Sequence, residues 1–227
     1  MQTQECSKDK EPMSDDILIR SARPEDADML AWTILAAARS HVPLGWLDIA
    51  LRQPRDSCLD YVRRLTLTQA RSWWHYSRFL VSEIDGNFAS ALCAFRAGDA
   101  YPQSAIAMAE AADSLGWSEQ DQKAMRERSA FVFSCMMETD DDFWVLENIA
   151  TLPKHCGRGL AQALIRYALL IGQSKGLRQA QITFLSGNEA AERTYIKAGF
   201  KFADEKCHPD FEAAIGARGL RRYIRDL

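Results

Sequence analysis

The sequence lacks any apolar run of about 18 residues, the least that would suggest a membrane-spanning helix. It also lacks a large net charge, since the net charge of its 227 residues is −3. A charge this small argues against the basic surface with which proteins bind nucleic acids. Residues 1–16 are polar and have no apolar core of a signal peptide. We therefore expect a cytoplasmic protein with a disordered tail over 1–16, and no membrane or nucleic-acid partner.

Clustered cysteines and histidines are absent as well. None of the six cysteines forms a C-x-x-C pair, and the four histidines are not spaced with them as zinc ligands usually are. Scattered thiols without a secretion signal are typical of a reducing compartment. We therefore expect reduced cysteines and no metal site.

The first half of the chain predicts a strand, helices and a hairpin. A β-favouring run at 17–20 precedes a helical pattern over 27–40, which begins after the helix-start residues Pro24-Glu25-Asp26. Strands at 79–84 and 88–95 flank Asp85-Gly86-Asn87, a sequence typical of a tight hairpin turn. These elements favour a sheet with helices packed against it.

The second half predicts alternating helices and strands. Residues 97–130 are alanine-rich and helical in pattern, and we interpret them as an insertion. Residues 131–137 are apolar enough for a strand, and later strands are expected at 179–185 and 220–225. The order predicts one domain over 17–227, of the α/β (α+β) class, built on a mixed sheet.

The stretch from Phe143 to Gly176 has the pattern of a phosphate-binding strand, turn and helix. An apolar run ends at Pro153, and a glycine-rich turn then opens an amphipathic helix. Unpaired N–H groups at a helix start, together with the helix dipole, favour an anion there. Many nucleotide and coenzyme folds share this arrangement, so the stretch alone leaves the ligand open.

Two motifs narrow that choice. The segment Cys156-Gly157-Arg158-Gly159-Leu160-Ala161 resembles the acyl-CoA pyrophosphate loop of the GNAT N-acetyltransferases, with Cys156 where that family prefers Arg or Gln. One strand later, the run from Asn188 to Phe200 is similar to the family's N-x-x-A-x-x-x-Y-x-x-x-G-F signature. The resemblance implies a GNAT-like mixed, twisted sheet with a splayed central pair of parallel strands, flanked by helices.

The resemblance also implies a reaction. It implies acetyl-CoA as cosubstrate, a primary amine of a small molecule or peptide as acceptor, and direct attack without a metal, and it leaves a homodimer open. A catalytically silent acyl-CoA sensor of the same fold is the alternative. The residues that the resemblance assigns to acetyl-CoA are the loop residues Cys156, Gly157, Arg158, Gly159, Leu160 and Ala161, the strand backbone of Ile149, Ala150 and Thr151, and Asn188.

Glu147 is the candidate general base. With a strand period of two, Phe143, Val145, Glu147 and Ile149 share one face. A carboxylate on so apolar a face is partly desolvated, which raises its pKa toward the range useful for a base. The alternative is a structural glutamate that faces a solvated cleft.

Tyr195 is the candidate general acid, because the resemblance assigns the tyrosine of the second motif to protonation of the CoA thiolate. The alternative is a core tyrosine on an amphipathic helix. Asn188 suits a helix start or a contact with the pantetheine arm, and Ser186 with Glu189 fits a capping box. Trp73 and the neighbouring tryptophan, with the predicted insertion, either line the acceptor pocket or simply pack.

Overall fold

The computed structural model describes residues 17–227, and the predicted tail lies outside them. Its strands form a single seven-stranded sheet in the order β1-β2-β3-β4-β5-β7-β6. Only β4 and β5 run parallel; every other neighbouring pair is antiparallel. The strands are β1 Ile17–Ser21, β2 Phe79–Ile84, β3 Asn87–Arg96, β4 Trp144–Thr151, β5 Gln179–Leu185, β6 Lys201–Cys207 and β7 Gly219–Asp226.

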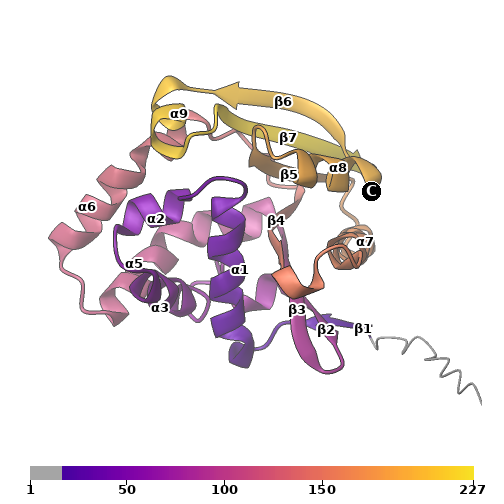
Figure 1. The fold of residues 1–227 in the computed structure, drawn as a ribbon, viewed down its shortest axis with the longest axis horizontal. Helices are drawn as coiled ribbons and strands as arrows, with labels where there is room; N and C mark the ends of the chain where they lie inside the picture. The colour runs from indigo at the N-terminus through magenta and orange to yellow at the C-terminus, as the bar shows by residue number, and fades with distance from the viewer. Residues whose placement is uncertain (1–16) are drawn as a thin grey trace, which may run out of the picture.

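Helices cover both faces of this sheet. Figure 1 shows α1, α2, α3 and α5 gathered on one side of β4, and α7 on the other. The α-helices are α1 Ala27–Arg39, α2 Trp46–Leu51, α3 Arg55–Leu65, α4 Ala97–Ala100, α5 Ser104–Ser114, α6 Glu119–Ser129, α7 Leu160–Ser174, α8 Glu189–Lys197 and α9 Pro209–Ile215. Short 3₁₀ helices are η1 Pro24–Asp26, η2 Tyr76–Arg78, η3 Tyr101–Gln103, η4 Ala130–Ser134 and η5 Pro153–His155. None of the helices within 17–227 is long and apolar enough to cross a membrane.

The mixed sheet and the hairpin predicted from the sequence are confirmed. Asp85 and Gly86 have φ values of 51° and 74°, as a tight turn between β2 and β3 requires. The strand predicted at 131–137 is wrong, because these residues form η4 and the turn after it. Phe131 and Cys135 pack with α9 instead of entering the sheet, with the rings of Phe131 and Phe211 5.8 Å apart.

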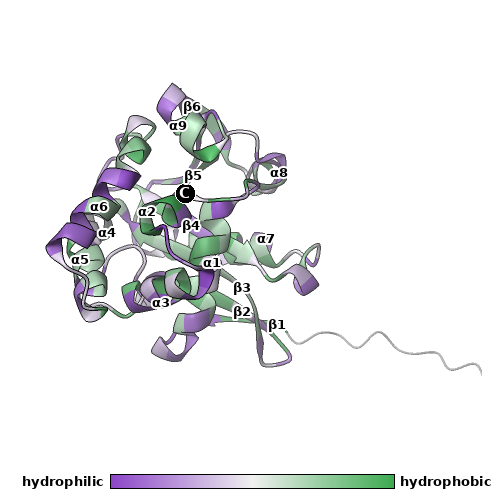
Figure 2. Ribbon diagram, turned by 60° about the vertical axis from the view of Figure 1, so that its left-hand side comes forward, coloured by the Kyte–Doolittle hydropathy of each residue, from purple (hydrophilic) through white to green (hydrophobic). Residues whose placement is uncertain are grey.

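Two apolar cores lie on the two faces of the sheet. The first lies under α1, α2, α3 and α5 and includes Ile34, Phe95 and Val145. The second lies under α7 and α8 and includes Leu146 and Leu164. In Figure 2, α6 is largely purple, in keeping with its place at the outside of the first layer. β4 contributes to both cores and therefore lies at the centre of the molecule.

Candidate active site

The central parallel pair opens halfway along β4. Residues 144–146 of β4 pair with residues 180–182 of β5, and the pairing ends there although both strands continue. Asn148 has a φ of 48° and is the extra residue of a β-bulge, since two residues of β4 oppose one residue of β3 between the pairs Cys93–Glu147 and Ala91–Ala150. The bulge bends β4 away from β5. The backbone of 147–151 on the β5 side is thus left without a strand partner.

The bulge also corrects one expectation about side-chain direction. Val145 and Glu147 share the α1 side of the sheet, as the alternation predicts, because Val145 belongs to the first core and Glu147 lies opposite Cys93 of the same core. Ile149 was expected on that face, but it packs against the second core under α7. The residue added at Asn148 shifts the alternation by one position.

Glu147 is the first residue of β4 beyond the paired segment. Its side chain is partly buried and faces a mostly apolar surface next to Cys93. Burial raises the pKa of Glu147 from 4.5 to about 8. The charge of Glu147 in turn raises the pKa values of Tyr101 and Cys93, after the larger effect of burial. The carboxyl group therefore changes protonation near neutral pH at the point where the sheet opens.

Tyr195 lies on the other face of the sheet. It lies on α8, is 8% exposed and packs edge-to-face on Phe184, with the ring centres 5.1 Å apart. Burial, and then the charge of Glu147, raise the pKa of Tyr195 well above 10. Tyr195 belongs to the second core, whereas Glu147 lies on the side of the first. The two predicted catalytic residues thus lie on opposite faces of the sheet.

The predicted acyl-CoA loop lies between η5 and α7. Gly157 and Gly159 have φ values of 80° and 77°, a conformation that side chains with a Cβ rarely adopt. Gly159 directly precedes α7, whose first N–H groups, from Leu160 and Ala161 onward, have no intrahelical acceptor. The loop therefore presents backbone donors at the positive end of a 15-residue helix.

Cys156 and Arg158 are exposed residues of this loop. The Cys156 thiol points toward the carbonyl oxygens of Thr151 and Leu152, at 3.8 and 3.7 Å, so it brings no cation to the loop. The Arg158 Nη1 lies 3.4 Å from Nδ1 of His155.

Asn188 connects two walls of the opening. Its side-chain oxygen accepts the N–H of Ala191 at 3.1 Å and so caps α8, and its Nδ2 donates to Ser40 Oγ at the end of α1 at 2.6 Å. The capping box predicted from Ser186 and Glu189 is wrong. Ser186 donates to Glu205 Oε1 at 2.6 Å, because Gly187, with a φ of 92°, turns the chain before the helix begins at Glu189.

Comparison with known proteins identifies the architecture. Residues 121–202, which hold β4, the loop, α7, β5 and α8, match the family model described as "Acetyltransferase (GNAT) domain". A structure described as "The crystal structure of acetyltransferase" has a TM-score of 0.68 and 20% sequence identity, over 92% of this chain and 98% of its own. The chain has the GNAT acetyltransferase fold. The resemblance inferred from the sequence is thereby confirmed.

Other GNAT-fold structures are similar at comparable length. An N-acetyltransferase from Staphylococcus aureus Mu50 has a TM-score of 0.66 and 21% identity, over 92% of this chain and 100% of its own. A Drosophila melanogaster polyamine N-acetyltransferase, which forms N-acetylagmatine, has a TM-score of 0.53 and 13% identity, over 93% and 100%. The comparison with curated proteins finds no match.

Several residues at the opening were not singled out from the sequence. Cys93 lies opposite Glu147 and donates through its thiol to the Trp73 carbonyl at 2.8 Å. Tyr101, from the start of the predicted insertion, packs on Trp73 with ring centres 6.1 Å apart. Asn148 carries the bulge. A sequence pattern signals none of these roles, although asparagine is one of the few residues that tolerate a positive φ.

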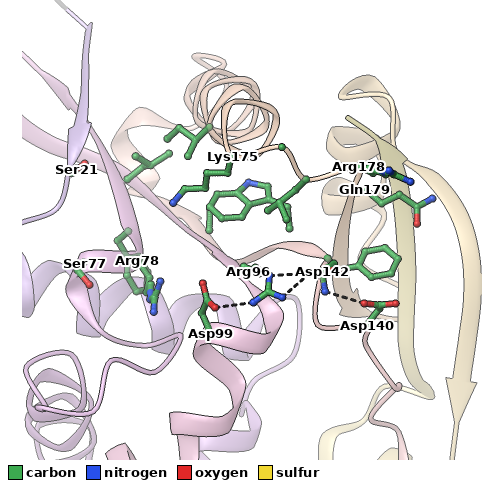
Figure 3. A pocket seen from close by; sticks show the side chains of 18 residues that line it. Ser21, Ser77, Arg78, Arg96, Asp99, Asp140, Asp142, Lys175, Arg178 and Gln179 are labelled. Atoms are coloured by element: carbon green, nitrogen blue, oxygen red, sulfur yellow. Dashed lines mark hydrogen bonds and ion pairs between the residues drawn. The ribbon is translucent and has the colours of Figure 1, made fainter.

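One further cavity lies away from this opening. A cavity of about 900 Å³, lined in part by Trp144, lies at the other end of the parallel pair and beside the end of α7 (Figure 3). Its wall includes Arg96, which is held by Asp99 at 2.9 Å and Asp142 at 2.6 Å, and Lys175, whose Nζ lies 5.8 Å from the centre of the Trp144 ring. Within residues 17–227, no three His, Cys, Asp or Glu side chains are grouped as metal ligands would be.

Proposed function

We propose that the protein transfers an acetyl group from acetyl-CoA to a primary amine. The observation that carries this proposal is the place of Glu147. Its carboxyl group, with a pKa raised to about 8, lies where the two parallel strands of a GNAT fold stop pairing. A base of that pKa accepts a proton near neutral pH and is still ionised often enough to act.

Acetyl-CoA fits the backbone groups around the opening. The unpaired edge of β4 at Ile149, Ala150 and Thr151 offers strand-like hydrogen bonds to the amides of a pantetheine arm. The turn from Gly157 to Gly159 and the first N–H groups of α7 offer donors for a pyrophosphate. Most of this binding runs through the backbone, so the thiol of Cys156 in place of Arg or Gln lowers the affinity without removing the site.

The chemistry is a direct displacement. Glu147 takes a proton from the acceptor ammonium, the freed amine nitrogen bonds to the acetyl carbon, and the carbon–sulfur bond breaks. The amine nitrogen gives up its second proton as the amide forms, and the CoA thiolate takes up that proton, so the products are a neutral amide and the CoA thiol. Positioning the amine against the thioester replaces an encounter in solution, which contributes up to about 7–11 kcal/mol in favourable cases.

Tyr195 assists the departure of sulfur. Because its pKa is raised well above 10, the phenol stays protonated throughout the working pH range. That pKa also exceeds an ordinary thiol pKa of about 8.5, so full proton transfer to the thiolate is uphill. Tyr195 therefore contributes mainly as a hydrogen-bond donor, and we expect a modest effect from its removal.

The acceptor is a small-molecule or peptide amine that enters on the α1 side. Glu147 opens onto that side, where Trp73 and Tyr101 supply aromatic surface. Aromatic rings near a carboxylate suit an ammonium group, through cation–π attraction.

The proposal is tested by measuring CoA release with a panel of primary amines, including agmatine, spermidine and a lysine peptide. Release with at least one amine supports it. Tyr195→Phe should lower kcat about fivefold while the Kd for acetyl-CoA stays unchanged, since a neutral donor of this kind contributes about 1 kcal/mol. A Tyr195→Phe enzyme as fast as wild type would remove Tyr195 from the mechanism.

A catalytically silent acyl-CoA sensor is the second candidate, favoured by Cys156 in a loop position where a cation is usual. Tight acetyl-CoA binding by calorimetry, without CoA release for any amine, would support the sensor. Failure to bind acetyl-CoA would exclude both functions.

A further inference from the structure

Glu147 is an isolated charge at the opening. Within residues 17–227, no charged side chain adds to or opposes the effect of burial on its pKa. The groups whose pKa values its own charge raises, Cys93, Tyr101 and Tyr195, all titrate above neutral pH and are uncharged there. Among the described residues, the carboxylate therefore has neither a cation to neutralise it nor a second acid beside it.

Aromatic rings lie beside Glu147 on the α1 side of the sheet. Cys93, which lies opposite Glu147, donates to the Trp73 carbonyl at 2.8 Å. The ring centre of Trp73 lies 6.3 Å from that of Phe95 and 6.1 Å from that of Tyr101. Phe95 is fully buried, whereas Trp73 and Tyr101 are only partly buried and keep surface that a ligand can contact. We call Trp73 and Tyr101 the aromatic wall.

This combination of one carboxylate and an uncharged wall suits only some amines. The reacting ammonium of an acceptor pairs with the ionised Glu147 and is attracted by the aromatic rings. A second ammonium a few ångströms further along the acceptor would lose its water without gaining a partner, which is strongly unfavourable. An aromatic body in the same place would instead pack against the wall.

We propose that the acceptor is a small arylalkylamine with a single ammonium group, and that Trp73 and Tyr101 select it. This inference rests on the proposed function, because it names the acceptor of the same acetyl transfer. Short diamines and polyamines are poor acceptors, since their second ammonium meets the wall. A lysine side chain brings a single ammonium but no ring to pack there.

Matched amines test each part of the proposal. Butylamine and 1,4-diaminobutane differ by the second ammonium, and 2-phenylethylamine and 2-cyclohexylethylamine differ by the aromaticity of the ring. Nα-acetyl-lysine methylamide represents a lysine in a peptide. The kcat/KM of each amine is measured by CoA release at saturating acetyl-CoA, with one preparation of the protein. The ratio between two amines then does not depend on the active fraction of the preparation.

For wild type, we expect butylamine to exceed 1,4-diaminobutane about 100-fold in kcat/KM, because a site without a polar partner rejects the added charge. The value for 2-phenylethylamine should exceed those for butylamine and the lysine derivative about tenfold each, as its larger apolar body is buried. It should exceed the value for 2-cyclohexylethylamine about threefold, the usual gain from aromatic pairing.

Substitutions in the wall locate this selectivity. Tyr101→Ala should lower the ratio of 2-phenylethylamine to butylamine about fivefold, as one aromatic contact is lost, whereas Tyr101→Phe keeps the ring and the ratio. Trp73→Leu tests the other half of the wall in the same way. Tyr167→Ala is the matched control, because Tyr167 is 44% exposed on α7, and it should leave the ratio unchanged.

Two results would overturn the proposal. A kcat/KM for 1,4-diaminobutane or for the lysine derivative that equals or exceeds that of 2-phenylethylamine would exclude an arylalkylamine acceptor, while leaving the acetyl transfer itself standing. Unchanged ratios in both Tyr101→Ala and Trp73→Leu would remove the wall from the selection. If no amine at all releases CoA from bound acetyl-CoA, the proposed function fails, and the acceptor class fails with it.

Discussion

The two halves of β4 differ in almost every physical property, although they belong to one strand. Residues 144–146 pair on both edges and are buried. Residues 147–151 have no partner on the β5 edge and are only partly buried. In the first half, Trp144 is 4% exposed and its Nε1 donates to the Ala168 carbonyl at 2.8 Å. In the second half, Glu147 and Asn148 bring polar groups to partly buried positions.

This contrast separates stability from chemistry along one strand. The paired half fixes the relative position of β4, β5 and α7, since a Cβ added at Gly172 of α7 would come within 2.7 Å of the Trp144 ring. The open half carries Glu147, whose pKa is raised by burial, and the Nδ2 of Asn148, which has no hydrogen-bond partner among the described residues. Both features lower the stability of the folded protein. Changes in the first half should therefore affect folding, and changes in the second should affect the reaction.

The largest expected effect is on catalysis, from Glu147→Gln. If Glu147 is the base, the substitution lowers kcat/KM about 10²–10⁴-fold, the usual contribution of a general base. In wild type kcat/KM should rise with pH up to about 8, the raised pKa of Glu147, because only the ionised carboxylate accepts a proton. Steady-state rates of CoA release between pH 6 and 9 measure the loss of kcat/KM in the variant and the pH profile of wild type. The acceptor amine used should have a pKa far from 8.

The pH profile provides the control. Glu147→Gln should lose the inflection near pH 8, whereas Tyr195→Phe should keep it. An unchanged inflection in the glutamine variant would assign the ionisation to another group and contradict the role of Glu147.

The substitution Glu147→Gln, which should lower activity, should raise the stability of the folded protein at high pH. The folded pKa of Glu147, about 8, lies above its ordinary value of 4.5, so the folded state favours the protonated form. The stabilisation of the folded state by the protonated carboxyl group is complete below about pH 4.5 and is lost as the pH rises through 8. Glu147→Gln should therefore raise the Tm at pH 9 and change it little at pH 4.5, as thermal unfolding at both pH values would show. A Tm difference independent of pH would contradict the raised pKa.

Substitutions in the paired half of β4 should affect stability more than activity. Trp144→Ala removes a buried ring and its hydrogen bond, and we expect it to lower the free energy of unfolding by about 3–5 kcal/mol. Leu170→Ala is the control, because Leu170 of α7 is 61% exposed, and it should change the free energy of unfolding by less than about 0.5 kcal/mol. Urea unfolding measures both. A folded Trp144→Ala protein should keep a kcat within a few-fold of wild type, and a 100-fold loss would contradict the separation.

The two halves of β4 also differ in how far the sequence predicts them. The apolar run 143–146, the loop glycines and the hairpin turn follow from local patterns, so the mixed sheet and the element order were predictable. The bulge was not, because period two holds for any strand until one residue takes a left-handed conformation, and the sequence around Asn148 does not signal it. Ile149 was placed on the wrong face for this reason.

Tertiary packing explains the remaining differences. The apolar stretch at 131–137 fits a strand locally, but in the fold its residues form a short helix that packs on α9, with Phe131 against Phe211. Tyr101 and Trp73 are near Glu147 because α4 and the residues after it pack against β3. Local periodicity does not report this contact.

The smallest effect is expected from Asn188→Ala, and it refines the comparison. Asn188 caps α8 and donates to Ser40, so it joins the walls on the two sides of the opening. Its loss should lower the free energy of unfolding by about 1 kcal/mol, the usual value for an N-cap. Ser118→Ala removes a similar cap from α6, away from the opening, and should cost about as much. Only Asn188→Ala should also raise the KM for acetyl-CoA, about threefold, because only this cap holds the opening together. Urea unfolding and steady-state kinetics on both variants measure the two effects. Equal KM values in the two variants would limit the role of Asn188 to stability.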